Sequence, residues 1–139
     1  MDDIYSQLPL REPTFFILLS LSPGPKHGYA ILKSVEILSD GRLKLSTGTL
    51  YGAIKRLLDR GWIRRVDDPL PNSTDRERKA YDLTKLGRNI LNAELRRLEE
   101  LVSVAQRQTV QEASQFLEFQ FIQKPARRSK GWHLKLTSR

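Results

Sequence analysis

The chain has 139 residues, of which 29% are charged and 39% hydrophobic, proportions ordinary for one globular domain with a core and room for a long extra helix. It contains no cysteine, which excludes disulfides, thiolate metal sites and cysteine nucleophiles together. The N-terminus opens with two aspartates, and the longest apolar run, residues 15–19, is too short to span a membrane. We therefore expect a cytoplasmic protein without a signal peptide or a membrane contact.

The formal net charge of +8 is unevenly distributed along the chain. Residues 123–139 hold six of the 24 basic residues and no acidic residue, whereas the rest of the chain is nearly balanced. Within that balanced part, residues 42–65 hold seven basic residues and one acidic residue. Clusters of this kind attract polyanions through an interaction that is independent of sequence and weakened by salt. Residues 42–65 are therefore a candidate polyanion-binding surface.

The first third of the chain predicts an arm followed by two helices. Residues 1–11 are interpreted as an N-terminal arm. Pro13 suits a first helical position, and residues 14–21 are apolar nearly all round, as in a helix buried in a core or a dimer seam. A second helix is predicted over residues 27–39, after a break rich in proline and glycine. Leu43 and Leu45 then alternate with basic residues, which predicts a short strand at best.

Residues 46–60, STGTLYGAIKRLLDR, carry the clearest helical pattern. Ser46 and Thr47 are both good N-cap types, and Gly61 is suited to the left-handed conformation that ends helices. Apolar residues recur at i, i+4, i+7 and i+8, and the opposite face is small, polar and mainly cationic. Such a helix suits insertion into a DNA major groove as the second helix of a helix-turn-helix. The residues expected to face base edges are Thr49, Gly52, Lys55 and Arg56.

Glycine is unusual on the outer face of this helix. At an exposed position such as Gly52 it costs roughly 1 kcal/mol relative to alanine. Gly48 and Gly52 either let the backbone of another molecule come close or are tolerated surface glycines. The sequence leaves both readings open.

The pattern changes to β after Gly61. Residues 62–66 and 79–83 are rich in strand formers and predict a hairpin with a long mobile tip between them. A hairpin directly after such a helix is a wing, and its arginine-rich limb favours contact with phosphates or the minor groove over a purely structural edge. Tyr51, on the flank of the basic helix, either donates to a phosphate or packs against this wing. The full set expected to contact phosphates or the minor groove is Ser46, Thr47, Tyr51, Arg64, Arg65, Arg76, Arg78 and Lys79.

A long helix is predicted at the C-terminal end. Thr84 can cap it, and neither glycine nor proline interrupts residues 89–124. Apolar residues repeat there with the 4, 3, 4, 3 spacing of a coiled-coil seam. The seam either packs on its own domain or, as we favour, joins two chains in a homodimer. The predicted dimerisation residues are Leu91, Leu95, Leu98, Val102 and Ala105.

Two questions about the C-terminal part stay open. The aromatic cluster over residues 116–122 either continues the long helix or folds back against a partner. The basic residues of the tail, 123–139, either follow DNA phosphates as an arm or belong to a solvated tail.

Several short stretches resemble the PadR family of transcriptional regulators. They are HGYAIL at residues 27–32, LSTGTLY at 45–51, RL at 56–57 before GWI at 61–63, and YDLT at 81–84 with GR at 87–88. They fall in the family's order and spacing over roughly residues 13–98. The resemblance implies a mainly α (α+β) fold: a winged helix-turn-helix over residues 12–83 with a two-stranded wing, and one C-terminal dimerisation helix over residues 84–122, as in the short type. One departure is Ala80 before Tyr81, where the family commonly has two adjacent aromatics.

We therefore expect a dimeric, sequence-specific regulator, usually a repressor in this family, that binds double-stranded DNA with inverted half-sites one turn apart. The alternative is a winged helix that binds another protein and no DNA. No enzyme, metal site or cofactor is expected, because the sequence has no phosphate-cradling glycine loop and its two histidines, His27 and His133, are far apart. The resemblance also implies a small aromatic effector near the dimer seam, but the seam helix has no tryptophan to stack on it. The operator, the target genes and any inducer are not readable from the sequence.

Overall fold

The computed structural model describes residues 3–67 and 79–123, with side chains up to residue 118. The predicted wing tip, with Arg76 and Arg78, and the basic tail lie outside the described residues. The elements are η1 (Ile4–Gln7), α1 (Glu12–Ser20), β1 (Lys26–His27), α2 (Gly28–Leu38), α3 (Thr47–Asp59), β2 (Ile63–Asp67), β3 (Lys79–Leu83) and α4 (Lys85–Gln123). The chain divides into two compact units, Met1–Leu95 and Arg96–Arg139, which are described separately.

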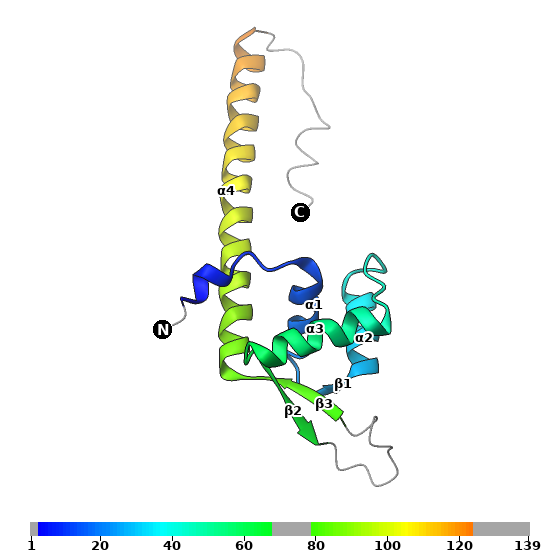
Figure 1. Ribbon diagram of the computed structural model, residues 1–139. Coiled ribbons are helices and arrows are strands. Elements are labelled where there is room, and N and C mark those ends of the chain that lie inside the picture. Colours follow the sequence, from blue (N-terminus) through cyan, green and yellow to red (C-terminus); the bar gives the residue numbers. More distant parts are fainter. Residues whose placement is uncertain (1–2, 68–78, 124–139) are drawn as a thin grey trace. The chain divides into compact units, whose positions relative to one another are not determined.

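The buried side chains of the first unit form one hydrophobic cluster, to which α1, α2, α3 and the start of α4 contribute. Figure 1 shows where these helices lie in the chain. Helix α1 is buried through residues such as Ile17 and Leu18, as expected for a helix without a polar face. Trp62, between α3 and β2, is only 3% exposed, so it belongs to this core. The buried cluster comprises Ile17, Leu18, Leu21, Ile31, Val35, Leu50, Ala53, Ile54, Leu57, Trp62, Ile63, Tyr81, Leu83, Ile90 and Leu91.

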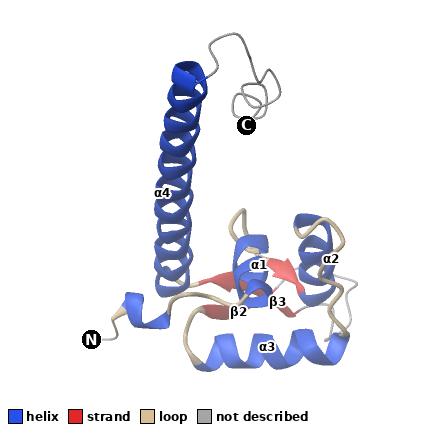
Figure 2. Cartoon of the chain, turned by 90° about the horizontal axis from the view of Figure 1, so that it is seen from above, coloured by secondary structure: helices blue, strands red, loops and turns tan. Residues whose placement is uncertain are grey.

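The sheet is antiparallel and has three strands in the order β1-β3-β2, labelled in Figure 1 and coloured red in Figure 2. Strands β2 and β3 pair from Ile63↔Leu83 to Asp67↔Lys79, which confirms the two predicted arms of the hairpin. The third strand, β1, pairs its Lys26 with Tyr81. The predicted two-stranded wing is therefore extended at its base by a strand that comes before α2. Two residues are too few to show an alternating pattern in the sequence.

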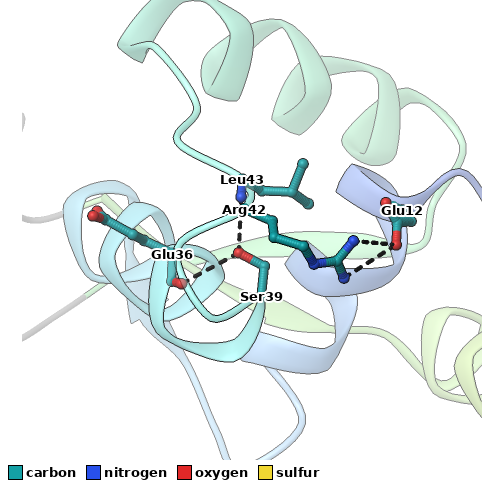
Figure 3. Close-up of polar contacts among 5 residues, drawn as sticks. All are labelled: Glu12, Glu36, Ser39, Arg42 and Leu43. Atoms are coloured by element: carbon teal, nitrogen blue, oxygen red, sulfur yellow. Dashed lines mark hydrogen bonds and ion pairs between the residues drawn. The ribbon is translucent and has the colours of Figure 1, made fainter.

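Side-chain to backbone hydrogen bonds hold the connection between α2 and α3 (Figure 3). The buried Ser39 hydroxyl donates to the Glu36 carbonyl oxygen at 3.2 Å and accepts the Leu43 N–H at 3.0 Å. The Arg42 guanidinium lies 3.3 Å from the Glu12 carboxylate, but these side chains are 62% and 59% exposed, so the pair adds little stability. The short strand expected at best at Leu43 and Leu45 does not form, and residues 43–46 have no regular secondary structure.

A tight joint links the end of α3 to the start of α4. Gly61 has φ +73°, the left-handed conformation predicted for the end of the basic helix. The Thr84 hydroxyl donates to the Gly61 carbonyl oxygen at 2.6 Å and accepts the Gly87 N–H at 3.0 Å, which confirms Thr84 as the predicted cap. The Thr84 N–H donates to the Trp62 carbonyl oxygen at 3.0 Å. Any Cβ at Gly87 would overlap that same carbonyl group, so only glycine fits.

Helix α4 runs without interruption to Gln123, so the helix continues through the aromatic cluster. Its first part belongs to the first unit, where Leu91 is buried in the core at 2% exposure. This corrects the predicted dimer seam, because a core side chain is not available to a second chain. Among the described residues, no helix combines the length and apolar character needed to cross a membrane.

The predicted arm is held against α4 by a buried carboxylate. Glu94 is 2% exposed, and its Oε2 accepts the Leu10 N–H at 2.6 Å. Ile4, Leu8 and Leu10 are partly buried against the core. Residues 4–10 are therefore part of the first unit rather than a free extension.

Candidate nucleic-acid interface

Ser46 and Thr49 organise the N-terminal end of α3. The Ser46 hydroxyl accepts the Thr49 N–H at 3.1 Å, so Ser46 is the N-cap and Thr47 is the first helical residue. The same Ser46 hydroxyl donates to the Thr49 hydroxyl at 2.8 Å. Since Thr49 accepts this bond, its own hydroxyl proton remains available to an outside acceptor.

The outer face of α3 is cationic and exposed. Leu50, Ile54 and Leu57 are buried in the core, which turns Lys55 and Arg56 to solvent. Within residues 3–67 and 79–123, neither Lys55 nor Arg56 makes an ion pair. Their charges are therefore available to a ligand from outside the chain.

Gly48 and Gly52, the two glycines of this face, are not packed closely against other described residues. A Cβ at Gly48 would meet nothing within 4 Å, and one at Gly52 would meet only the Arg56 guanidinium at 3.7 Å. Neither residue has a positive φ. Neither packing within the described residues nor backbone conformation requires glycine at these positions. The structure leaves open space above them, which is compatible with close approach of another molecule.

The two arginines of β2 lie on opposite faces of the wing, because neighbouring side chains of a strand alternate. Arg64 pairs across the sheet with Asp82, and the guanidinium lies 3.5 Å from the carboxylate. Arg65 pairs with Tyr81 in the sheet register, and its positive charge lies close enough to the phenol to lower the pKa of Tyr81. The charge of Arg64 is thus partly neutralised, whereas Arg65 faces a neutral partner.

A hollow of about 220 Å³ lies between α3 and the wing, lined by Tyr51, Arg65, Lys79 and Tyr81. Burial is the main reason why the pKa of Tyr81 is raised above its ordinary value of 10.0, and nearby Tyr51 raises it further. The positive charge of Arg65 opposes this rise only in part. Tyr81 therefore stays a protonated phenol at neutral pH. We refer to these four residues as the Tyr–Arg–Lys hollow.

Sequence reasoning named three members of the hollow but missed Tyr81. The signal was available, since Lys79 and Tyr81 are two residues apart on one strand and so share a face. The other predicted contact residues that the structure describes lie outside the hollow. Gly52 is half-buried on α3, and Arg64 is exposed on the face of the wing opposite to Arg65. The residues exposed on α3 or at its N-cap are Ser46, Thr47, Thr49, Lys55 and Arg56.

The other four predicted dimerisation residues follow Leu91 along α4. Leu95 is 36% exposed and Val102 53% exposed, Ala105 is exposed, and Leu98 is half-buried. Leu101, Val104 and Val110 are also exposed. Apart from Leu91, the predicted seam is therefore accessible in the single chain. In the part of the chain that the structure describes, no cluster of three or more histidine or acidic residues could hold a metal ion.

Comparisons with known proteins give the family. The model of the transcriptional regulator PadR-like family matches residues 17–93, more than half of the chain. A curated relative, an uncharacterized 37.1 kDa protein in transposon TN4556 of Streptomyces fradiae, is 32% identical over 84 residues. That match covers 60% of this chain but only 22% of the relative, so the chain spans about a fifth of that protein's length.

Solved structures agree with the family match. A transcriptional regulator from Clostridium thermocellum is 25% identical with a TM-score of 0.55, over 68% of this chain and 87% of that one. Bacillus subtilis PadR, solved in complex with operator DNA, is 27% identical with a TM-score of 0.54, over 63% of this chain and 48% of that one. A PadR regulator from Clostridium difficile, 24% identical over 68% of this chain and 94% of that one, has the same fold with a TM-score of 0.57. The protein described here is thus a winged-helix member of the PadR-like family of transcriptional regulators, and not a member of an enzyme family.

Proposed function

We propose that this protein is a homodimeric, sequence-specific DNA-binding repressor. The observation that carries the proposal is the outer face of α3, where Lys55 and Arg56 are exposed and make no ion pair within the described residues, opposite a fully buried apolar stripe. Family membership supports a regulatory role, and the B. subtilis relative was solved with operator DNA.

Helix α3 would lie in the major groove. An arginine there can make two hydrogen bonds to the O6 and N7 atoms of guanine, and we assign this role to Arg56. Thr49 would donate its free proton to a base acceptor, and Lys55 would bind a neighbouring base or phosphate. The open space at Gly48 and Gly52 leaves room for the duplex to approach the helix backbone.

The wing would contact the phosphate backbone or the minor groove. Arg65 and Lys79 are exposed on the face that also carries Tyr81, and they are the described wing residues that we expect to contribute most. Arg64 should contribute less, because Asp82 partly neutralises it. Arg76 and Arg78 remain predicted contacts outside the described residues.

Dimerisation would pair the accessible seam of two chains. Leu95, Leu98, Val102 and Ala105 follow the heptad spacing, and burying them against a second copy would remove apolar surface from water. A two-fold dimer would place its two recognition helices roughly 34 Å apart, which matches inverted half-sites one helical turn apart.

The test compares operator with random DNA. An operator is first selected from random duplexes by repeated binding, and affinities are then measured by fluorescence anisotropy at fixed salt. We expect Arg56→Ala to weaken operator binding by about 1–3 kcal/mol and random-duplex binding by less. Arg11→Ala is the matched control, because it removes the same charge at an exposed position outside residues 42–65. Equal losses on both duplexes would show that Arg56 reads no base.

The salt dependence separates this proposal from the alternative of a protein-binding winged helix. DNA binding should weaken steeply as salt rises, because each neutralised phosphate releases counterions. A winged helix that binds only an apolar protein surface would show no affinity for the duplex at any salt concentration.

A further inference from the structure

The Tyr–Arg–Lys hollow has the chemistry of an anion site. Two of its lining residues are cations, Arg65 and Lys79, and the other two, Tyr51 and Tyr81, carry phenol groups that can donate a hydrogen bond. Among the residues that the structure describes, no carboxylate lines it. Asp67 lies opposite Lys79 in the sheet register but is not one of the lining residues.

Tyr81 is prepared as a donor. The guanidinium of Arg65 lies opposite Tyr81 in the sheet and has no acceptor atom, so it cannot take the phenol proton, which is left for another acceptor. Burial keeps that proton in place, because it disfavours the charged phenolate. A negatively charged oxygen in the hollow would satisfy both the phenol and the guanidinium.

Gly28 determines where the second phenol can lie. It is the buried first residue of α2, and a Cβ there would stand only 2.5 Å from the Tyr51 Oη and 3.0 Å from its Cζ. The backbone of Gly28 has no positive φ that would otherwise require glycine. The missing side chain of Gly28 therefore makes the room in which the Tyr51 hydroxyl lies.

We infer that the Tyr–Arg–Lys hollow seats one backbone phosphate of DNA, bound by Tyr51, Tyr81, Arg65 and Lys79, and that Gly28 is a positioning residue for Tyr51. The inference rests on the proposed DNA binding and deepens it, since it adds Tyr81 and Gly28 and assigns four side chains to a single phosphate. We assign one phosphate and not two because Arg65 and Lys79 line the same small hollow, whose volume is about 220 Å³.

The first experiment counts phosphates by the salt dependence of binding to a random-sequence duplex. Neutralising one phosphate contributes about 0.9 to the slope of log K against log salt. The double variant Arg65→Gln/Lys79→Gln should therefore lower the slope by about 0.9. A decrease of about 1.8 would show that the two cations bind separate phosphates and would overturn the shared seat.

Phenylalanine variants test the phenols in the same assay. Tyr51→Phe and Tyr81→Phe should each weaken binding roughly three- to tenfold, the effect of losing one hydrogen bond, and leave the salt slope unchanged. Tyr5→Phe is the matched control, because Tyr5 is exposed in η1 and does not line the hollow. Unchanged affinity in both hollow variants would overturn the donor roles.

Combining two variants tests Gly28. Gly28→Ala should reduce affinity about as much as Tyr51→Phe, and adding Gly28→Ala to Tyr51→Phe should cause little further loss. Losses that multiply in the double variant would overturn the positioning role. Circular dichroism and thermal unfolding of each variant confirm the fold. Failure of the unaltered protein to bind any duplex would instead refute the proposed function, so the two failures are distinguishable.

Discussion

The two units differ in how their apolar side chains are covered. In residues 3–95 the apolar faces of the helices meet in one core, and side chains such as Ile31 and Ile54 are almost fully buried. In residues 96–118 Leu101, Val104 and Val110 are 54–55% exposed, although they belong to the same continuous helix, α4. A regular helical pattern thus says which residues share a face, but not what covers that face. The first unit covers most of its own, with Ile37 and Leu38 of α2 as exposed exceptions, and the second leaves a surface that suits another chain.

The largest effect on stability is expected from a substitution at Gly87, the most closely packed glycine of the first unit. Gly87→Ala would push a methyl group into the Trp62 carbonyl, and we expect a loss of about 3 kcal/mol or more of unfolding free energy. Gly48→Ala is the matched control, because a Cβ there meets nothing within 4 Å, and it should be neutral or slightly stabilising. Urea denaturation followed by circular dichroism measures both. Similar losses in the two variants would contradict the close packing at Gly87.

A second pair of variants locates the boundary between the covered and uncovered parts of α4. Leu91→Ala should destabilise the fold by about 2–5 kcal/mol, since Leu91 lies in the core at 2% exposure. Leu95→Ala, one turn later and 36% exposed, should cost clearly less in the monomer. Denaturation at low protein concentration separates this effect from dimerisation. Equal costs would move the boundary beyond Leu95.

The uncovered surface is tested by its effect on association. Val102→Asp places a charge on the predicted seam and should weaken the dimer by roughly tenfold or more without unfolding the first unit. Gln111→Asp introduces the same charge nine residues later. At about 100° per residue this is about two and a half turns, so Gln111 lies on the opposite side of the helix from Val102 and its substitution should have little effect. Sedimentation equilibrium gives both dissociation constants. An unchanged dimer in Val102→Asp would show that the seam lies elsewhere.

The smallest effect concerns the titration of Tyr81. Its raised pKa means that the native state keeps the phenol proton longer than the unfolded chain, so stability is lost as pH rises beyond the ordinary value of 10.0. In an alkaline absorbance titration of the four tyrosines, Tyr81→Phe should remove the latest phase. Arg65→Gln should delay that phase further, because it removes the one group that lowers the pKa of Tyr81. A titration unchanged by Tyr81→Phe would refute the burial argument.

Local signals in the sequence predicted much of this fold. Ser46, Gly61 and Thr84 mark helix boundaries because capping depends on a few neighbouring residues, and all three lie where expected. The strand predicted over residues 79–83 is also confirmed, since strand-forming residues are a local signal that the sequence shows directly.

Features that depend on distant packing were missed. The third strand has only two residues, and the close approaches at Gly28 and Gly87 involve partners far along the chain. Leu91 was misassigned because a core stripe and a dimer stripe share the same spacing. Glu94 gave a signal, since a carboxylate three residues after Leu91 falls on the apolar face and needs a buried partner.

For the candidate interface, the sequence predicted which residues of α3 are exposed but not how the wing divides its charges. The helix period alone turns Lys55 and Arg56 outward. The difference between Arg64 and Arg65 depends on which β3 residue each one faces, and register is set by the folded hairpin. The contacts of these residues with DNA remain predictions.

The joint at Thr84 has a practical consequence for engineering. One hydroxyl fastens Gly61 to Gly87, so residues 84–87 must match the segment that follows α3. A chimaera that grafts the C-terminal helix of another regulator onto this domain should therefore be spliced downstream of Leu95, where the first unit ends, and not at the apparent start of the helix. Splicing at the start of α4 would replace Thr84 and Gly87 and leave Gly61 and Trp62 without the residues that they contact.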